Sequence, residues 1–126
     1  MPSPAEFDPT DLAAQERAAA RLAEEERLAV ERARNELRWV MSTKQGRRFI
    51  YRQLSGAGIW KSSFDTDALR MAFAEGSRNG GLQLLSEIME TCPDRYTEML
   101  TEQKETEDAA RNRTADRRNT HRNAPR

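Results

Sequence analysis

Two clusters of basic residues are the parts of this sequence best suited to bind another molecule. The first occupies residues 39–64, which hold five bases and no acid, interleaved with aromatic residues: Lys44, Arg47, Arg48, Arg52 and Lys61, with Phe49, Tyr51 and Trp60. The second lies near the C-terminus and consists of six arginines: Arg111, Arg113, Arg117, Arg118, Arg122 and Arg126. Because lysine and arginine neutralise phosphates without reading base sequence, both clusters are candidates for non-specific DNA contact. The alternatives are a solvated or acid-paired surface for the first cluster and a solubilising or protein-docking arm for the second.

Residues for catalysis or metal binding are scarce. His121 is the only histidine, and Cys92 is the only cysteine. Cys92 precedes a predicted helix, a position that can lower the pKa of a thiol, but the central part of the chain offers no histidine to act as its base. There is also no phosphate-binding glycine loop with its lysine. We therefore predict no enzymatic activity, no catalytic residue, no cofactor and no metal site.

The charge of the chain is polarised although its formal net charge is zero. Residues 39–64 and 111–126 are basic, and the stretches before and between them are net acidic. Such blocks can bind partners of either sign, or one another. No apolar run approaches the roughly 18 residues of a membrane span, and the N-terminus lacks the basic start and apolar stretch of a signal peptide. We expect a cytoplasmic protein without a membrane-spanning segment.

Capping signals and periodicity predict the helices that position these residues. Asp8 is a predicted N-cap with Pro9 at the first helical position, and no glycine or proline occurs from Asp11 to Met41. The apolar stripe of this long helix is narrow, so its first part is expected to project from the domain. We predict an all-α fold in three parts: an N-terminal tail and projecting charged helix over residues 1–36, a compact core of about three helices over 37–100, and a disordered charged tail with a basic end over 101–126.

Ser42 or Thr43 is the predicted N-cap of the second helix, and the fourth helix is predicted to begin at Pro93. Between them lies the third helix, from about Asp67 to Thr91. Its apolar stripe recurs at steps of four and three: Leu69, Phe73, Gly76, Gly80, Leu84 and Ile88. Each glycine inside a helix costs about 1 kcal/mol relative to alanine. We therefore predict that Gly76 and Gly80 allow close packing of a neighbouring helix. The alternative is a kink or an anion-binding turn over residues 75–81.

The predicted core is small for independent stability. A unit of roughly 60 residues buries only about 60% of the surface that its unfolded chain exposes. A homo-oligomer or a docked partner is therefore expected.

An ordered set of short segments in the core resembles a known family. The segments are Gly46-Arg47-Arg48-Phe49, Gly58-Ile59-Trp60, Phe73-Ala74-Glu75-Gly76-Ser77-Arg78-Asn79-Gly80-Gly81-Leu82 and Pro93-Asp94-Arg95-Tyr96. From about Leu37 to Leu100 the chain resembles a family of small proteins of short-tailed bacteriophages, known from a Bordetella phage. The resemblance implies a virion or assembly component encoded among head, portal and packaging genes, with no enzymatic activity.

The resemblance leads to one main functional expectation. It is a bacteriophage structural or assembly protein that docks by its helix faces at the head, portal vertex or ejection apparatus. Its partners would be portal or head–tail components, and it would reside in the host cytoplasm during assembly and then in the virion. The alternative is a nucleic-acid-binding accessory protein of phage DNA packaging or replication. A third possibility is a scaffold or chaperone that leaves before maturation.

Overall fold

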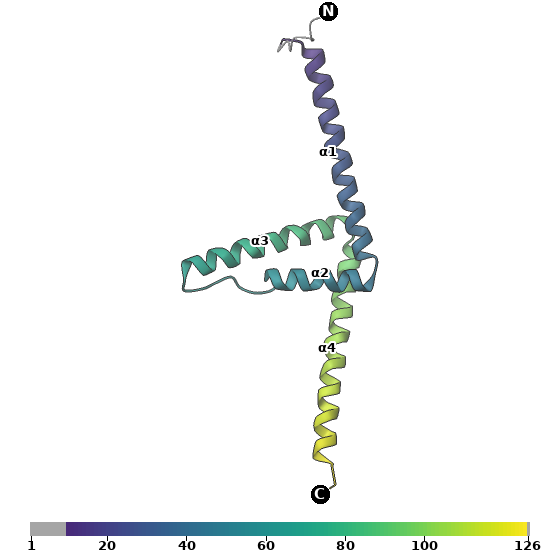
Figure 1. Cartoon of the computed structure of the whole chain (residues 1–126), viewed down its shortest axis with the longest axis vertical. Helices are drawn as coiled ribbons and strands as arrows, with labels where there is room; N and C mark the ends of the chain where they lie inside the picture. The colour runs from purple at the N-terminus through teal and green to yellow at the C-terminus, as the bar shows by residue number, and fades with distance from the viewer. Residues whose placement is uncertain (1–9, 126) are drawn as a thin grey trace, which may run out of the picture. The chain divides into compact units, whose positions relative to one another are not determined.

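The computed structural model describes residues 10–125, which form four helices and no strand (Figure 1). The helices are α1 (Leu12–Met41), α2 (Lys44–Ala57), α3 (Ala68–Thr91) and α4 (Pro93–Arg122). The predicted all-α fold, with a long first helix and three more behind it, is confirmed. By its internal contacts the chain divides into two units, one ending at Glu36 and the other beginning at Leu37, so the division falls inside α1.

The described part of the first unit is α1 as far as Glu36. The predicted cap, Asp8 with Pro9, lies outside the described residues; Asp11 caps the helix instead, its Oδ1 accepting a hydrogen bond from the Ala14 N–H at 3.1 Å. The large apolar side chains here are exposed: Leu12, Leu22, Leu28 and Val30. Surface ion pairs are each worth about 0–1 kcal/mol, so the helix depends mainly on the high helix propensity of its Ala, Glu, Arg and Leu residues.

Both ends of α2 carry the capping groups that the sequence predicts. Thr43 Oγ1 accepts a hydrogen bond from the Gly46 N–H at 3.0 Å, which satisfies one of the free donors at the helix start. Gly58 has φ 79°, a left-handed conformation that favours glycine, and its N–H donates to the carbonyls of Leu54 and Ser55. The helix therefore runs through Gly56 and ends at Ala57.

The second unit is built on α2 and α3, which lie side by side and antiparallel, and α4 crosses them where α2 begins and α3 ends (Figure 1). Six buried apolar side chains hold these helices together: Met41, Ile50, Leu54, Ile59, Ile88 and Met99. Full burial of one such side chain stabilises the fold by about 1.5–3 kcal/mol. With six of them, the apolar core is small.

Close packing of α3 occurs at Gly81, whereas the sequence predicted it at Gly76 and Gly80. A Cβ atom at Gly81 would lie 2.6 Å from Ile59 Cγ2 and 2.7 Å from Ala57 Cβ, so a side chain there would force its neighbours to move. At Gly76 and Gly80 a Cβ atom would meet nothing within 4 Å among residues 10–125, apart from the adjoining residues and the nearby backbone of α3 itself. The predicted stripe faces the core only at its C-terminal end, because the core side of α3 runs through Gly81 and Ile88. The alternative, a turn over residues 75–81, is also corrected, since this stretch is helical throughout.

The structure describes a helix where the sequence predicted a disordered tail, because α4 continues through residues 101–122. Several side chains form hydrogen bonds within this helix. Threonine hydroxyls at four positions donate to the carbonyl four residues earlier, at 2.8–3.1 Å: Thr101, Thr106, Thr114 and Thr120. His121 and Arg122 place basic groups in the last turn, where the helix dipole favours them. The expectation of disorder depended on the lack of large apolar residues, which a single helix does not require.

Candidate functional site

Arg47, which the sequence suggested as a contact residue, is part of the protein interior. It is 5% exposed, and its guanidinium donates to Glu102 through Nη2 at 2.6 Å and through Nε at 3.1 Å. Nη1 donates to the Met41 carbonyl at 2.9 Å, and Glu98 lies 3.2 Å from Nη2. Arg47 therefore joins α2, α4 and the end of α1, and it is not available to DNA or to a partner. The sequence signal for Glu98 and Glu102, which the sequence-based prediction of contact residues missed, is their four-residue spacing on one side of a helix.

The electrostatics of this cluster favour the charged forms of both partners. The hydrogen bond from Arg47 lowers the pKa of the Glu102 carboxyl, and the charges of Arg47, Lys44 and Arg48 lower it further. The hydrogen bond to Glu102 raises the pKa of Arg47. Glu102 is partly shielded from solvent, its side chain being 19% exposed. The pair thus forms a salt bridge that links α2 to α4.

Three other basic residues of α2 form an exposed row along one side of the helix: Lys44, Arg48 and Arg52. They follow one another at four-residue steps, so their side chains lie on one face. Among residues 10–125 no acidic group lies within 4.0 Å of any of the three. Arg48 and Arg52 also line a shallow depression with Tyr51 and, from α4, Gln103. The row keeps the predicted site residues Arg48 and Arg52 together and accessible.

Aromatic rings border this row. The Arg52 guanidinium lies 5.5 Å from the centroid of the Phe49 ring, a cation–π distance. Tyr51 stacks on Trp60 with centroids 5.1 Å apart. The row can therefore bind an anionic surface by charge and by flat stacking contact.

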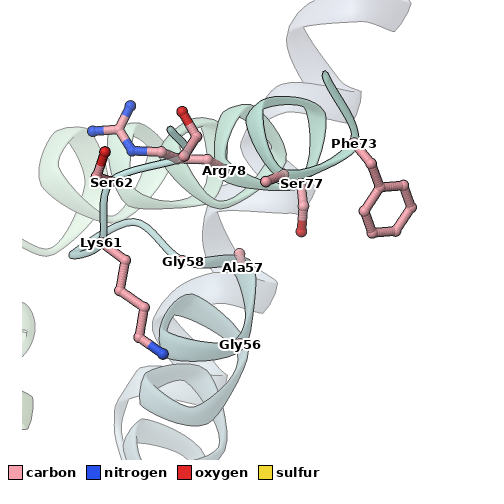
Figure 2. Close-up of a pocket in the computed structure, with 10 residues that line it drawn as sticks. Gly56, Ala57, Gly58, Lys61, Ser62, Phe73, Ser77 and Arg78 are labelled. Carbon is pink, nitrogen blue, oxygen red and sulfur yellow. The ribbon is translucent and has the colours of Figure 1, made fainter. Parts of the chain in front are cut away.

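A second cleft, of about 260 Å³, lies between the end of α2, the following loop and α3 (Figure 2). Lys61 and Arg78 contribute cations, and Ser62, Ser63 and Ser77 contribute hydroxyls. Ser63 donates a hydrogen bond to Glu75, which also lies 3.9 Å from Arg78. Much of the polar capacity of this cleft is therefore satisfied within the chain.

The C-terminal arginines are arranged by α4 into two sets on opposite sides of the helix. Arg111, Arg118 and Arg122 share one face with Lys104 through steps of seven, seven and four residues. Arg113 and Arg117 lie on the other side. All five arginines are exposed, and within the described residues one of them forms an ion pair, Arg111 with Asp108 at 3.2 Å. They stand apart from the α2 row, since Arg111 is nine residues, or roughly 14 Å, beyond Glu102 along the helix.

Neither Cys92 nor His121 belongs to a cluster of chemical groups. Burial raises the pKa of the Cys92 thiol, with smaller opposing effects from Arg38 and Arg95, so the thiol form predominates at neutral pH. Across residues 10–125 no three side chains of His, Cys, Asp and Glu gather as metal ligands would. None of the helices in this same range contains a stretch long and apolar enough to cross a membrane.

Comparison with known proteins identifies the family of the chain. No curated protein and no solved structure matched it. The family described as Bbp19-like phage protein matches residues 37–101, which include α2, α3, Arg47 and Gly81. The match spans half of the chain and confirms the resemblance to a phage family, so the protein belongs to the Bbp19-like phage proteins.

Proposed function

We propose that this protein is a non-enzymatic structural or assembly component of a bacteriophage, which docks by its helix faces onto other virion proteins. Portal or head–tail components are the partners we propose, at the head, the portal vertex or the ejection apparatus. On this proposal the protein associates with itself, resides in the host cytoplasm during assembly and then enters the virion.

One observation carries the proposal: a member of a phage family leaves much of its helical surface without a partner in its own chain. The apolar side chains of α1 before Glu36 are exposed, and α4 is exposed from residue 109 onward. A helix that is polar all round spans solvent between folded parts, depends on many local pairs, or is unstable alone. We propose that residues 37–100 form the folded core, and that residues 1–36 and 101–126 are the arms that other virion proteins bind.

Deletion of the gene in the phage, combined with mass spectrometry of purified virions, tests the proposal. The expected result is that the protein is present in wild-type particles and that the deletion reduces the yield of infectious particles. Expression of the protein from a plasmid restores the yield. Absence from the particle together with normal assembly of the deletion phage contradicts the proposal. Presence in immature heads alone would identify a scaffold or chaperone that leaves before maturation.

A second candidate function is nucleic-acid binding during packaging or replication. The observation in its favour is that α2 and α4 display exposed cations in rows, of which Arg111 alone forms an ion pair within residues 10–125, with aromatic rings beside the α2 row. Contacts of this kind bind phosphates without base specificity and weaken steeply with salt. Fluorescence anisotropy with labelled duplex DNA at increasing salt tests this function, and undetectable binding at low ionic strength excludes it.

A further inference from the structure

The N-terminal half of α3 exposes an apolar face that no other part of the described chain covers. Leu69 and Phe73 are 83% and 81% exposed, and Gly76 and Gly80 continue the same face toward the C-terminus. Phe73 lines one edge of the neighbouring cleft, and its ring points away from Lys61 and Arg78 (Figure 2). We call these four residues, Leu69, Phe73, Gly76 and Gly80, the α3 stripe.

The composition of the α3 stripe is unusual for a surface that only meets water. Glycine destabilises a helix interior relative to alanine, and a Cβ atom at either position would meet open space. Nothing within residues 10–125 therefore requires glycine there. The absence of a side chain does permit the backbone of another helix, or a large ring, to approach closely.

We propose that the α3 stripe binds the α3 stripe of a second copy of this chain, with the two helices antiparallel. The stripe is complementary to itself about a point midway between Gly76 and Ser77. Phe73 and Gly80 are equally distant from this point along the sequence, so the ring of each copy meets the bare backbone of the other. Leu69 is likewise opposite Leu84, which is only partly exposed because it also packs against the core of its own chain.

Charge favours the antiparallel direction. Arg70 is 73% exposed, and its nearest carboxylates, Asp65 and Asp67, lie 3.9 and 3.7 Å from Nε. Glu87, near the other end of α3, is exposed and has no ion pair among the described residues. An antiparallel pair brings Arg70 of one copy close to Glu87 of the other, whereas a parallel pair brings like charges together. The stripe itself carries no charge, which argues against DNA as its occupant.

The size of the contact predicts a weak dimer. A buried phenylalanine contributes about 150–250 Å², so two stripes with their flanking residues reach on the order of 1,000 Å², the lower limit of specific interfaces. Interfaces at this lower limit of size are typical of weak or transient association. This inference deepens the self-association included in the proposed function, and it does not depend on where in the particle the protein resides.

Sedimentation equilibrium of the full-length protein tests the interface. The wild type is expected to approach twice its 14.4 kDa mass as its concentration rises. Phe73→Ser and, separately, Gly80→Leu are expected to raise the dissociation constant at least about tenfold, with unchanged helix content by circular dichroism. Met89→Ser is the matched control, because Met89 is also an exposed apolar residue of α3 but lies on the opposite side of the helix from the stripe.

A charge reversal tests the direction of the pair. Arg70→Glu is expected to weaken the dimer, and Arg70→Glu combined with Glu87→Arg is expected to restore it. A wild type that stays monomeric, or a dimer that Phe73→Ser and Gly80→Leu leave intact, overturns the proposal. If the dimer responds as expected but the protein is absent from virions, the phage function fails and the interface stands.

Discussion

Arg47 of α2 and Glu102 of α4 are 55 residues apart in the sequence and share three hydrogen bonds: Nη2 donates to Oε1 at 2.6 Å, and Nε donates to both carboxylate oxygens at 3.1 Å. The sequence makes Arg47 a candidate contact for DNA or a partner, with an acid-paired surface as the alternative; the pair with Glu102 agrees with the alternative, except that Arg47 is buried. Its contact with Glu102 fixes the crossing of two helices whose apolar core is small, and this relationship determines how the unit responds to mutation and to acid.

Replacement of Arg47 by alanine is expected to destabilise the protein by about 2–4 kcal/mol, because removal of one partner leaves Glu102 without its hydrogen bonds in a partly shielded position. Arg47→Lys is expected to recover only part of the loss, since lysine cannot form the two-point contact. Urea denaturation followed by circular dichroism measures the effect. Arg48→Ala is the control because Arg48 is exposed, and a loss of equal size in that variant would contradict this role of Arg47.

The stability of the protein is expected to fall as pH decreases through the folded-state pKa of Glu102. This pKa lies below the ordinary value of 4.5, so the unfolded state binds a proton at higher pH than the folded state does. The stabilisation is complete above the unfolded-state pKa and is lost below it as Glu102 is protonated. The free energy of unfolding, measured from neutral pH down to about pH 3, is expected to fall less steeply in Glu102→Gln. An identical slope in the two proteins would show that other carboxylates cause the acid sensitivity.

Gly81→Ala is expected to destabilise the second unit by about 1–3 kcal/mol, because the new methyl group would overlap Ile59 and Ala57. Gly56→Ala is the matched control, since a Cβ atom there meets no neighbour and alanine favours the helix. Thermal unfolding of both variants checks the pair. If Gly81→Ala is as stable as the wild type, the close contact of α3 with the end of α2 is not required for the fold.

Substitution of Arg111, Arg118 and Arg122 by glutamine tests the DNA-binding candidate function. If all three contact phosphates, the slope of the logarithm of the binding constant against the logarithm of salt concentration is expected to become shallower by about 2.7, because each lost contact contributes about 0.9. The same change at Lys44, Arg48 and Arg52 measures the contribution of the α2 row. Substitution of Arg17, Arg21 and Arg32 by glutamine in α1 is the control; an equal effect there would indicate non-specific attraction to any cationic helix.

The helices of this protein could be predicted because their limits depend on nearby residues. Thr43 and Gly58 cap α2, and Pro93 starts α4, through contacts within a few positions of each residue. The all-α class and the central helices followed from these signals. The helical state of residues 101–122 did not follow from them, because a segment without large apolar residues is expected to be disordered.

The site could be predicted only in part, since it depends on how the helices pack. Sequence spacing places Leu69, Phe73, Gly76, Gly80 and Ile88 on one side of α3, but it does not show that the core side runs through Gly81, so that only the C-terminal end of this stripe is buried. Likewise, nothing local distinguishes Arg47 from Arg48, although the first is buried and the second exposed. That difference arises from the position of Glu102 on α4.

Because α4 is one continuous helix from Pro93 to Arg122, it sets the distance between the residues at its two ends. Its axis advances about 1.5 Å per residue, so Arg118 stands roughly 24 Å from Glu102, at an orientation that the residue count sets. A molecule that binds Arg118 and Arg122 would therefore lie at a fixed distance and angle from the α2–α3 pair. Two glycines inserted between Glu102 and Arg118 would make α4 more flexible at that point. Seven inserted residues would lengthen the helix by about 10 Å and leave the arginine side chains pointing in nearly the same direction.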